Sequence, residues 1–161
     1  MNKMLVALVG ATALVSGAAN ASIEVKAKRM MTEKVMVEEI AKVQAACSNT
    51  AVSPTFDWSQ WDTYNFKEER LDELKTTGWL GSLVNNIYDD MVKLCTTTEH
   101  AELYKAEFQK VEKIQFSGQE SIKANKSKFV LADGGKVLNV SLNPNAAYDS
   151  STIKYIKQAW N

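Results

Sequence analysis

The chain has 161 residues, with 19 lysine and arginine residues against 19 aspartate and glutamate residues, so its formal net charge is zero. The hydrophobic fraction of 45% is ordinary for a folded domain and argues against a chain that is disordered throughout. The charge balance argues against a dedicated nucleic-acid binder, because there is no basic excess to neutralise phosphates. Two prolines and seven glycines exclude collagen-like and proline-rich architectures.

Residues 1–21 have the pattern of a cleavable signal peptide. Lys3 gives the segment a basic start, residues 5–19 carry no charge, and Ala19-Asn20-Ala21 is an A-x-A cleavage site. The alternative is a membrane anchor, but the apolar run is shorter than the ~20 residues that a span needs. We therefore predict a mature chain of residues 22–161, forming a single globular domain without a membrane span.

Export sets the expected chemistry of the two cysteines. Cleavage removes Lys3 and leaves a net charge of about −1, and the short alanine-rich signal indicates the periplasm of a Gram-negative bacterium or secretion from it. In an oxidising compartment, Cys47 and Cys95 are expected to form one disulfide. The alternative is a reactive thiol, but the chain has no C-x-x-C pair and His100 is its only histidine.

Apolar periodicity predicts the helices. From about residue 31 the apolar residues follow a helical spacing that ends at Cys47, after an alternating segment at 22–28 that suggests a short strand or a frayed lead-in. After a charged helical segment that ends near Gly78, a second strong stripe covers residues 80–95. Because both stripes end in a cysteine, the disulfide would join two helix C-termini in a parallel or crossing geometry. Shorter helices are expected at residues 101–111 and 153–160.

The strands are expected mainly in the second half of the chain. Residues 48–65, which include Pro54, are interpreted as a long connection, and residues 113–116 alternate like a strand. Asp133-Gly134-Gly135 separates two apolar runs and predicts a hairpin, because such a tight turn needs positive φ. The expected fold is α+β, with about four to five α-helices and a small two- or three-stranded antiparallel sheet covered by helices on one face.

The segment from Phe56 to Phe66 is the most distinctive surface candidate. Its aromatic residues Trp58, Trp61 and Tyr64 are interleaved with the carboxylates of Asp57 and Asp62. The preferred interpretation is that the aromatic rings anchor a long connection to the core, since large rings bury much area. The alternatives are a surface for a partner protein, and a glycan-binding surface on which flat rings stack against sugars.

Other residue groups carry weaker signals. Asp89-Asp90, expected on the exposed side of the second main helix, and Glu68-Glu69 belong to no recognised motif. Met30, Met31 and Met36 are interpreted as part of a helical core, with an adaptable interaction face or a copper-binding thioether set as alternatives. The chain lacks the calcium-loop and phosphate-loop patterns, and one histidine is too few for a zinc site.

The sequence thus predicts no catalytic residues, no metal site and no cofactor. The leading hypothesis is a non-enzymatic exported protein that binds another envelope or extracellular macromolecule, with an inhibitor, accessory or immunity-like role. One alternative is a glycan or small-ligand binder that uses residues 56–66. Another alternative is a hydrolase with dispersed carboxylates.

Overall fold

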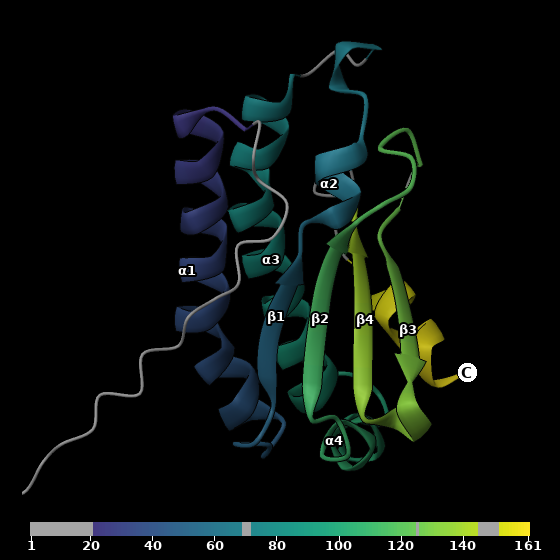
Figure 1. Cartoon of the computed structure of the whole chain (residues 1–161). Helices are drawn as coiled ribbons and strands as arrows, with labels where there is room; N and C mark the ends of the chain where they lie inside the picture. The colour runs from purple at the N-terminus through teal and green to yellow at the C-terminus, as the bar shows by residue number, and fades with distance from the viewer. Residues whose placement is uncertain (1–20, 69–71, 125, 145–151) are drawn as a thin grey trace, which may run out of the picture.

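Two long helices form the frame of the fold. The computed structural model describes residues 21–68, 72–124, 126–144 and 152–161, and it places α1 (Ile23–Ala46) beside α3 (Glu73–Thr96), with 24 residues in each helix (Figure 1). Val35 lies against Gly81 in the first half of α3, and Lys42 pairs with Asp89 further along both helices at 2.7 Å. The two helices therefore run in the same direction.

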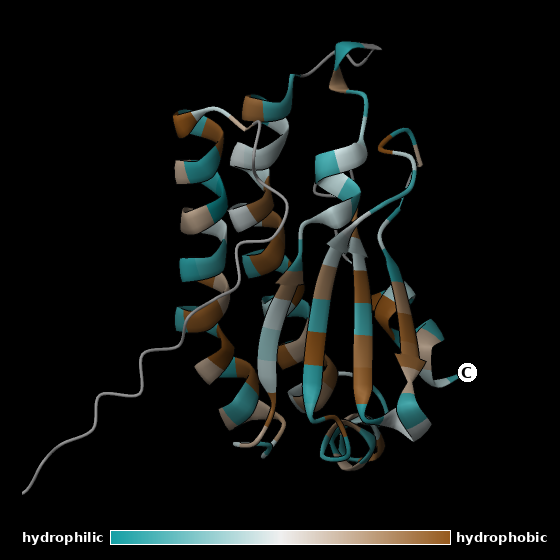
Figure 2. Ribbon diagram, viewed as in Figure 1, coloured by the Kyte–Doolittle hydropathy of each residue, from teal (hydrophilic) through white to brown (hydrophobic). Residues whose placement is uncertain are grey.

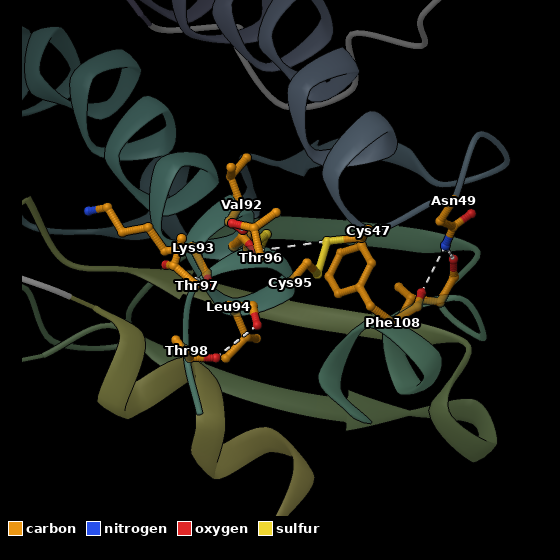
Figure 3. Close-up of a disulfide and its surroundings, with 12 residues drawn as sticks. Cys47, Asn49, Val92, Lys93, Leu94, Cys95, Thr96, Thr97, Thr98 and Phe108 are labelled. Atoms are coloured by element: carbon orange, nitrogen blue, oxygen red, sulfur yellow. Dashed lines mark hydrogen bonds between the residues drawn. A yellow bond between two sulfur atoms is a disulfide. The ribbon is translucent and has the colours of Figure 1, made fainter. Parts of the chain in front are cut away.

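The disulfide joins the ends of these two helices. Cys47, the C-cap of α1, is bonded to Cys95 in the last turn of α3, with their Cα atoms 5.2 Å apart (Figure 3). Both cysteines are buried in the core, beside the ring of Phe108. The predicted disulfide and the parallel geometry of its two helices are confirmed.

The sequence pattern misplaced the start of α1. The helix begins at Ile23 rather than near residue 31, and Ser22 caps it by accepting a hydrogen bond from the Val25 N–H at 3.2 Å. The strand considered for residues 22–28 is therefore wrong. Met36 is buried as expected, but the prediction of a core position is wrong for Met30 and Met31, which are exposed.

α3 is one continuous helix. Asp72 caps it, accepting a hydrogen bond from the Lys75 N–H at 2.9 Å, and the helix passes through Gly78 without the expected break. Its inner face supplies the largest part of the core, with seven side chains that are fully removed from solvent: Leu80, Leu83, Val84, Ile87, Tyr88, Met91 and Leu94.

Short helices and turns link the larger elements. In the described part of the chain these are α2 (Ser59–Thr63), α4 (Ala101–Phe108), α5 (Ile153–Lys157) and the 3-10 segments η1 (Phe66–Glu68), η2 (Asp133–Gly135) and η4 (Gln158–Trp160). The expected helices at residues 101–111 and 153–160 are present, although the second ends as a 3-10 turn.

The sheet has four strands in the described part of the chain, and it is mixed. The strands are β1 (Ser53–Asp57), β2 (Lys113–Gly118), β3 (Lys128–Ala132) and β4 (Val137–Leu142), in the spatial order β1-β2-β4-β3. β3 and β4 form the predicted antiparallel hairpin, and φ is positive at all three residues of η2. β1 pairs with β2, and β2 with β4, in parallel. The α+β class is confirmed, but the all-antiparallel sheet is wrong.

The missing element in the sequence interpretation was β1, inside the supposed connection 48–65. Its exposed Ser53, Thr55 and Asp57 alternate with half-buried Pro54 and Phe56, a weak apolar pattern. Pro54 argues against a central strand, but a strand at the edge of a sheet tolerates proline because one side of its backbone needs no partner. β1 is such an edge strand.

One face of the sheet packs against the helices. Five side chains of β2 and β4 on this face are fully buried: Ile114, Phe116, Leu138, Val140 and Leu142. Figure 1 shows α3 passing behind β1 and β2, with α5 behind the β4 and β3 side of the sheet. Brown bands alternate with teal or white ones along β2 and β4 in Figure 2, as expected when only one face of a sheet meets a core.

Asp90 ties the last helix to α3. The expectation that both Asp89 and Asp90 are exposed is wrong for Asp90, whose carboxylate accepts hydrogen bonds from the N–H and hydroxyl of Thr152, at 2.6 and 2.9 Å. Lys93 donates a third bond at 3.0 Å. Burial alone raises the pKa of Asp90, but the bonds from Lys93 and Thr152 outweigh it and hold the pKa below its ordinary value.

The disulfide is expected to be a major source of stability. Replacing both Cys47 and Cys95 with alanine should lower the free energy of unfolding by roughly 4 kcal/mol, because the unfolded chain is no longer closed into a long loop. Urea unfolding of the variant and of the parent protein measures this difference. Labelling of both thiols in the native, unreduced protein would contradict the disulfide itself.

The stability contributed by Asp90 should depend on pH. Because its folded-state pKa is lowered, the stabilisation is present above the unfolded-state value of about 3.9 and is lost as the pH falls through the folded-state value. Asp90→Asn should therefore cost about 1–3 kcal/mol at neutral pH and much less in acid. Urea unfolding across pH tests this, with Asp89→Asn, a half-exposed neighbour, as the control; a loss independent of pH would contradict it.

Candidate functional site

The aromatic segment folds as a compact corner after β1. The Asp57 side chain accepts a hydrogen bond from the Ser59 N–H at 2.9 Å, which turns the chain into α2. Trp61 is the one buried residue of α2, with 2% of its surface exposed. Asp57 itself stays exposed, on the face of the sheet that points away from the helices.

The rings of this corner pack on one another. Phe56 stacks on Trp58 with ring centroids 3.8 Å apart, and Trp61 stacks on Phe66 at 5.6 Å. Tyr64 meets Phe66 edge-on at 4.9 Å. All five rings contact the hydrophobic core. We call this group, Phe56, Trp58, Trp61, Tyr64 and Phe66, the aromatic cluster.

A nearly buried arginine joins the aromatic cluster to the two long helices. Arg29 on α1 donates to Asp62 at 2.7 Å and to Glu73 on α3 at 3.1 Å. Its guanidinium carbon lies 4.8 Å from the centre of the Trp58 ring, a cation–π distance. The two carboxylates therefore face a cation that belongs to the protein itself.

Trp58 is held by its polar edge as well as by its ring. Its indole N–H donates to Glu33 on α1 at 2.8 Å. The sequence indicated Trp58, Trp61 and Asp62 as neighbours in one segment, and the structure brings them together. It adds Arg29, Glu33 and Glu73, which come from distant elements and belong to no motif.

Gly118 at the end of β2 makes room for Trp61. A Cβ at this position would overlap the Trp61 indole, and the clash would fall on a rigid ring rather than on a flexible side-chain end. The chain therefore needs glycine here for a close approach. This contact fixes α2 over the end of β2 and sets the position of the whole aromatic cluster.

The second candidate surface is the face of the sheet that points away from the helices, which we call the open sheet face. In Figure 1 it is turned towards the viewer, with the long helices behind and beside it. Strand register places its side chains in three rows across the sheet. The rows are Ser53-Lys113-Val137-Ala132, then Thr55-Gln115-Asn139-Val130, then Asp57-Ser117-Ser141-Lys128.

The middle of this face carries no charge. Gln115, Ser117, Asn139 and Ser141 occupy the two central strands, β2 and β4, and are half-buried. The charged residues lie at its margins, with Asp57 and Lys128 on the two edge strands and Lys113 at the start of β2. The alternation of polar residues in 113–117 and 137–141 could have indicated such a surface, but its width depends on β1, which the sequence pattern did not reveal.

Buried polar side chains fix the upper rim of the open sheet face. Gln119 follows β2 and donates to the carbonyl oxygens of Lys126 and Ser141. Ser127 accepts a hydrogen bond from the Asn143 N–H at 3.2 Å. These bonds join the described parts of the loop after β2 to the end of β4.

The binding residues predicted from the sequence therefore fall on two sides of the sheet. Trp58, Trp61 and Asp62 lie in the aromatic cluster and its ion pairs, whereas Asp57 borders the open sheet face. Tyr64 is half-buried against Phe66. Binding of a ligand by these residues stays a prediction.

Across the described ranges, no three histidine, cysteine, aspartate or glutamate side chains gather in a way that could hold a metal ion. Among the helices of the same ranges, none is long and apolar enough to cross a membrane. Comparison of the chain with protein-family models, curated proteins and solved structures finds no match.

The contact of Gly118 with Trp61 gives a test of how the aromatic cluster is positioned. Gly118→Ala should lower the free energy of unfolding by about 1–3 kcal/mol and change the near-ultraviolet circular dichroism of the tryptophans, because the indole must move. Gly81→Ala is the matched control. Its new Cβ would meet neighbours only at 3.7 Å and beyond, and in a helix it should be neutral or stabilise by up to about 1 kcal/mol. Equal behaviour of the two variants would contradict the packing described here.

Proposed function

We propose that this is an exported, non-enzymatic protein that binds another envelope or extracellular protein through its open sheet face. The observation that carries the proposal is a four-stranded sheet with helices on one side and, on the other, an open face whose central residues Gln115, Ser117, Asn139 and Ser141 are polar and uncharged. A sheet face of this kind offers a broad, rigid platform for a second macromolecule.

The distribution of charge supports a protein partner. Protein interfaces are depleted of charged residues at their centre and carry polar and charged residues around the rim. The open sheet face has this arrangement, with Gln115 and Asn139 at its centre and Asp57 and Lys128 at opposite edges. Docking there removes few charges from water, so little electrostatic energy is lost on binding.

The disulfide and the first helix support the proposed export. The Cys47–Cys95 bond is of a kind that persists in oxidising compartments. Ser22, the residue expected to begin the mature chain, is also the N-cap of α1. Removal of residues 1–21 would thus leave the first helix and its capping side chain complete.

The aromatic cluster supports the anchoring role more than a glycan site. Sugar stacking needs an accessible ring face. Trp61 is buried, and Trp58 is stacked on Phe56 with the Arg29 guanidinium over its ring. The same ion pairs give Asp62 and Glu73 a structural partner, which offers no support to a carboxylate hydrolase.

Site-specific photo-crosslinking tests the proposal. A photoreactive amino acid at position 139 should give a defined protein adduct in producing cells, identified by mass spectrometry, because Asn139 lies at the centre of the proposed interface. The same group at Ser82, an exposed position on α3, should give none. Adding Gln115→Arg should abolish the adduct while the thermal unfolding curve stays unchanged.

Two outcomes would contradict the proposal. Equal adducts from positions 139 and 82 would show unspecific capture, and no adduct at 139 in a folded, exported protein would show that this face meets no partner. N-terminal sequencing of the exported protein in the same preparation tests the cleavage, which should leave Ser22 as the first residue.

A further inference from the structure

The outward face of α1 carries a row of exposed apolar side chains. Ile23, Met30 and Val37 follow one another at intervals of seven residues and are 83%, 69% and 60% exposed. Ala27 and Ala41 lie between and beyond them on the same side of the helix and are also exposed. We call the row Ile23, Ala27, Met30, Lys34, Val37 and Ala41 the α1 stripe.

The α1 stripe is separate from the face by which α1 joins the core. The inner face buries Met36, Ile40 and Val43, among others. A helix at the surface of a domain needs only one apolar face, and its opposite face is usually polar. Four of the seven large apolar residues that stand exposed in the described ranges are on α1, at Ile23, Met30, Met31 and Val37.

The spacing of the stripe identifies what kind of surface it is. Steps of four, three, four, three and four residues keep one line of side chains facing a neighbouring helix, as in a coiled-coil seam. From residue 23 to residue 41 this line is roughly 27 Å long, at 1.5 Å per residue. The natural partner of such a seam is another helix with the same repeat.

We propose that a second copy of this protein covers the α1 stripe, with the two α1 helices antiparallel. In this arrangement Ile23 faces Ala41 of the second copy, Ala27 faces Val37, and Met30 faces Lys34. A large side chain meets a small one in the outer layers, and the flexible thioether of Met30 lies along the Lys34 stem, whose ammonium group reaches water.

The opposite orientation fits poorly. In a parallel pair each residue faces its own copy, so Lys34 would meet Lys34 and repel it, and Ala27 would meet Ala27 and leave a gap. In the antiparallel orientation the stripe is thus self-complementary in size, and its one charged residue, Lys34, does not meet a second lysine. The net charge of about −1 expected for the mature chain adds almost no repulsion between two copies.

Sedimentation equilibrium of the mature protein tests the association. The wild-type protein should show a dimer that dissociates on dilution, and Val37→Glu should be monomeric over a roughly hundredfold range of concentration, because a charge is buried in the seam. Leu103→Glu on α4 is the matched control, since Leu103 is 67% exposed and lies outside the stripe. It should dimerise as the wild type does.

Cysteine trapping tests the orientation. The double variant Ala27→Cys, Val37→Cys should form a disulfide-linked dimer on mild oxidation, because the two positions face each other across the seam. Ala27→Cys alone should not form this dimer. In the antiparallel pair, residue 27 of each copy faces residue 37 of the other copy, ten positions away from the second residue 27. The native cysteines do not interfere, because both are in the buried disulfide.

Three results would overturn the proposal. They are a wild-type protein that is monomeric throughout the concentration range, a dimer that survives Val37→Glu, and trapping by Ala27→Cys alone, which would indicate a parallel pair. If the first result is found, binding of the monomer to lipid vesicles through the stripe would assign this surface to a membrane. None of these results bears on the open sheet face, which shares no residue with the stripe.

Discussion

The parallel packing of α1 and α3, fixed at one end by the Cys47–Cys95 disulfide, determines the path of the chain through the sheet. Because α1 and α3 point the same way, the chain has to run back over the length of one helix, roughly 36 Å, before α3 can begin. A strand covers such a distance with few residues, at about 3.3 Å each, and β1 begins that return. Asn49 fixes its start, binding the Phe108 and Val111 carbonyl oxygens at 2.8 and 2.7 Å (Figure 3). β2 therefore begins beside β1 and runs with it.

The sequence predicted the elements whose signals are local. The Asp133-Gly134-Gly135 turn defines a hairpin by itself, and the cysteine that closes each apolar stripe indicates the direction of the two helices. β1 was missed because nothing in its own residues indicates a strand. Pro54 and three polar residues form a strand only because they pair with β2. The start of α1 was missed for a related reason: its apolar residues lie on both the inner and the outer face of the helix, so its first turns show no single apolar stripe.

The candidate sites likewise combine features that are local in the sequence with features that depend on tertiary contacts. The aromatic residues were visible in one segment, but their packing depends on Arg29, Glu33 and Gly118, which lie far away in the chain. Their role as a folded corner follows from these tertiary contacts, and the open sheet face follows from strand register. Residues such as Gln115 and Asn139 have no motif, and they become a surface only when four strands align them in rows.

The two surfaces proposed for binding have to work in a protein whose net charge is close to zero. A nearly neutral protein has no strong field to draw a partner to it, so its association depends on the area and rigidity of its contacts. The open sheet face is neutral at its centre, so we expect one such face to bind its partner with modest affinity. Pairing through α1 would place two of these faces on one rigid particle, and a partner with repeated sites would then bind with higher effective affinity without any new contact. The exposed apolar residues on α1 bury little of their surface in the monomer, and their regular spacing therefore points to assembly.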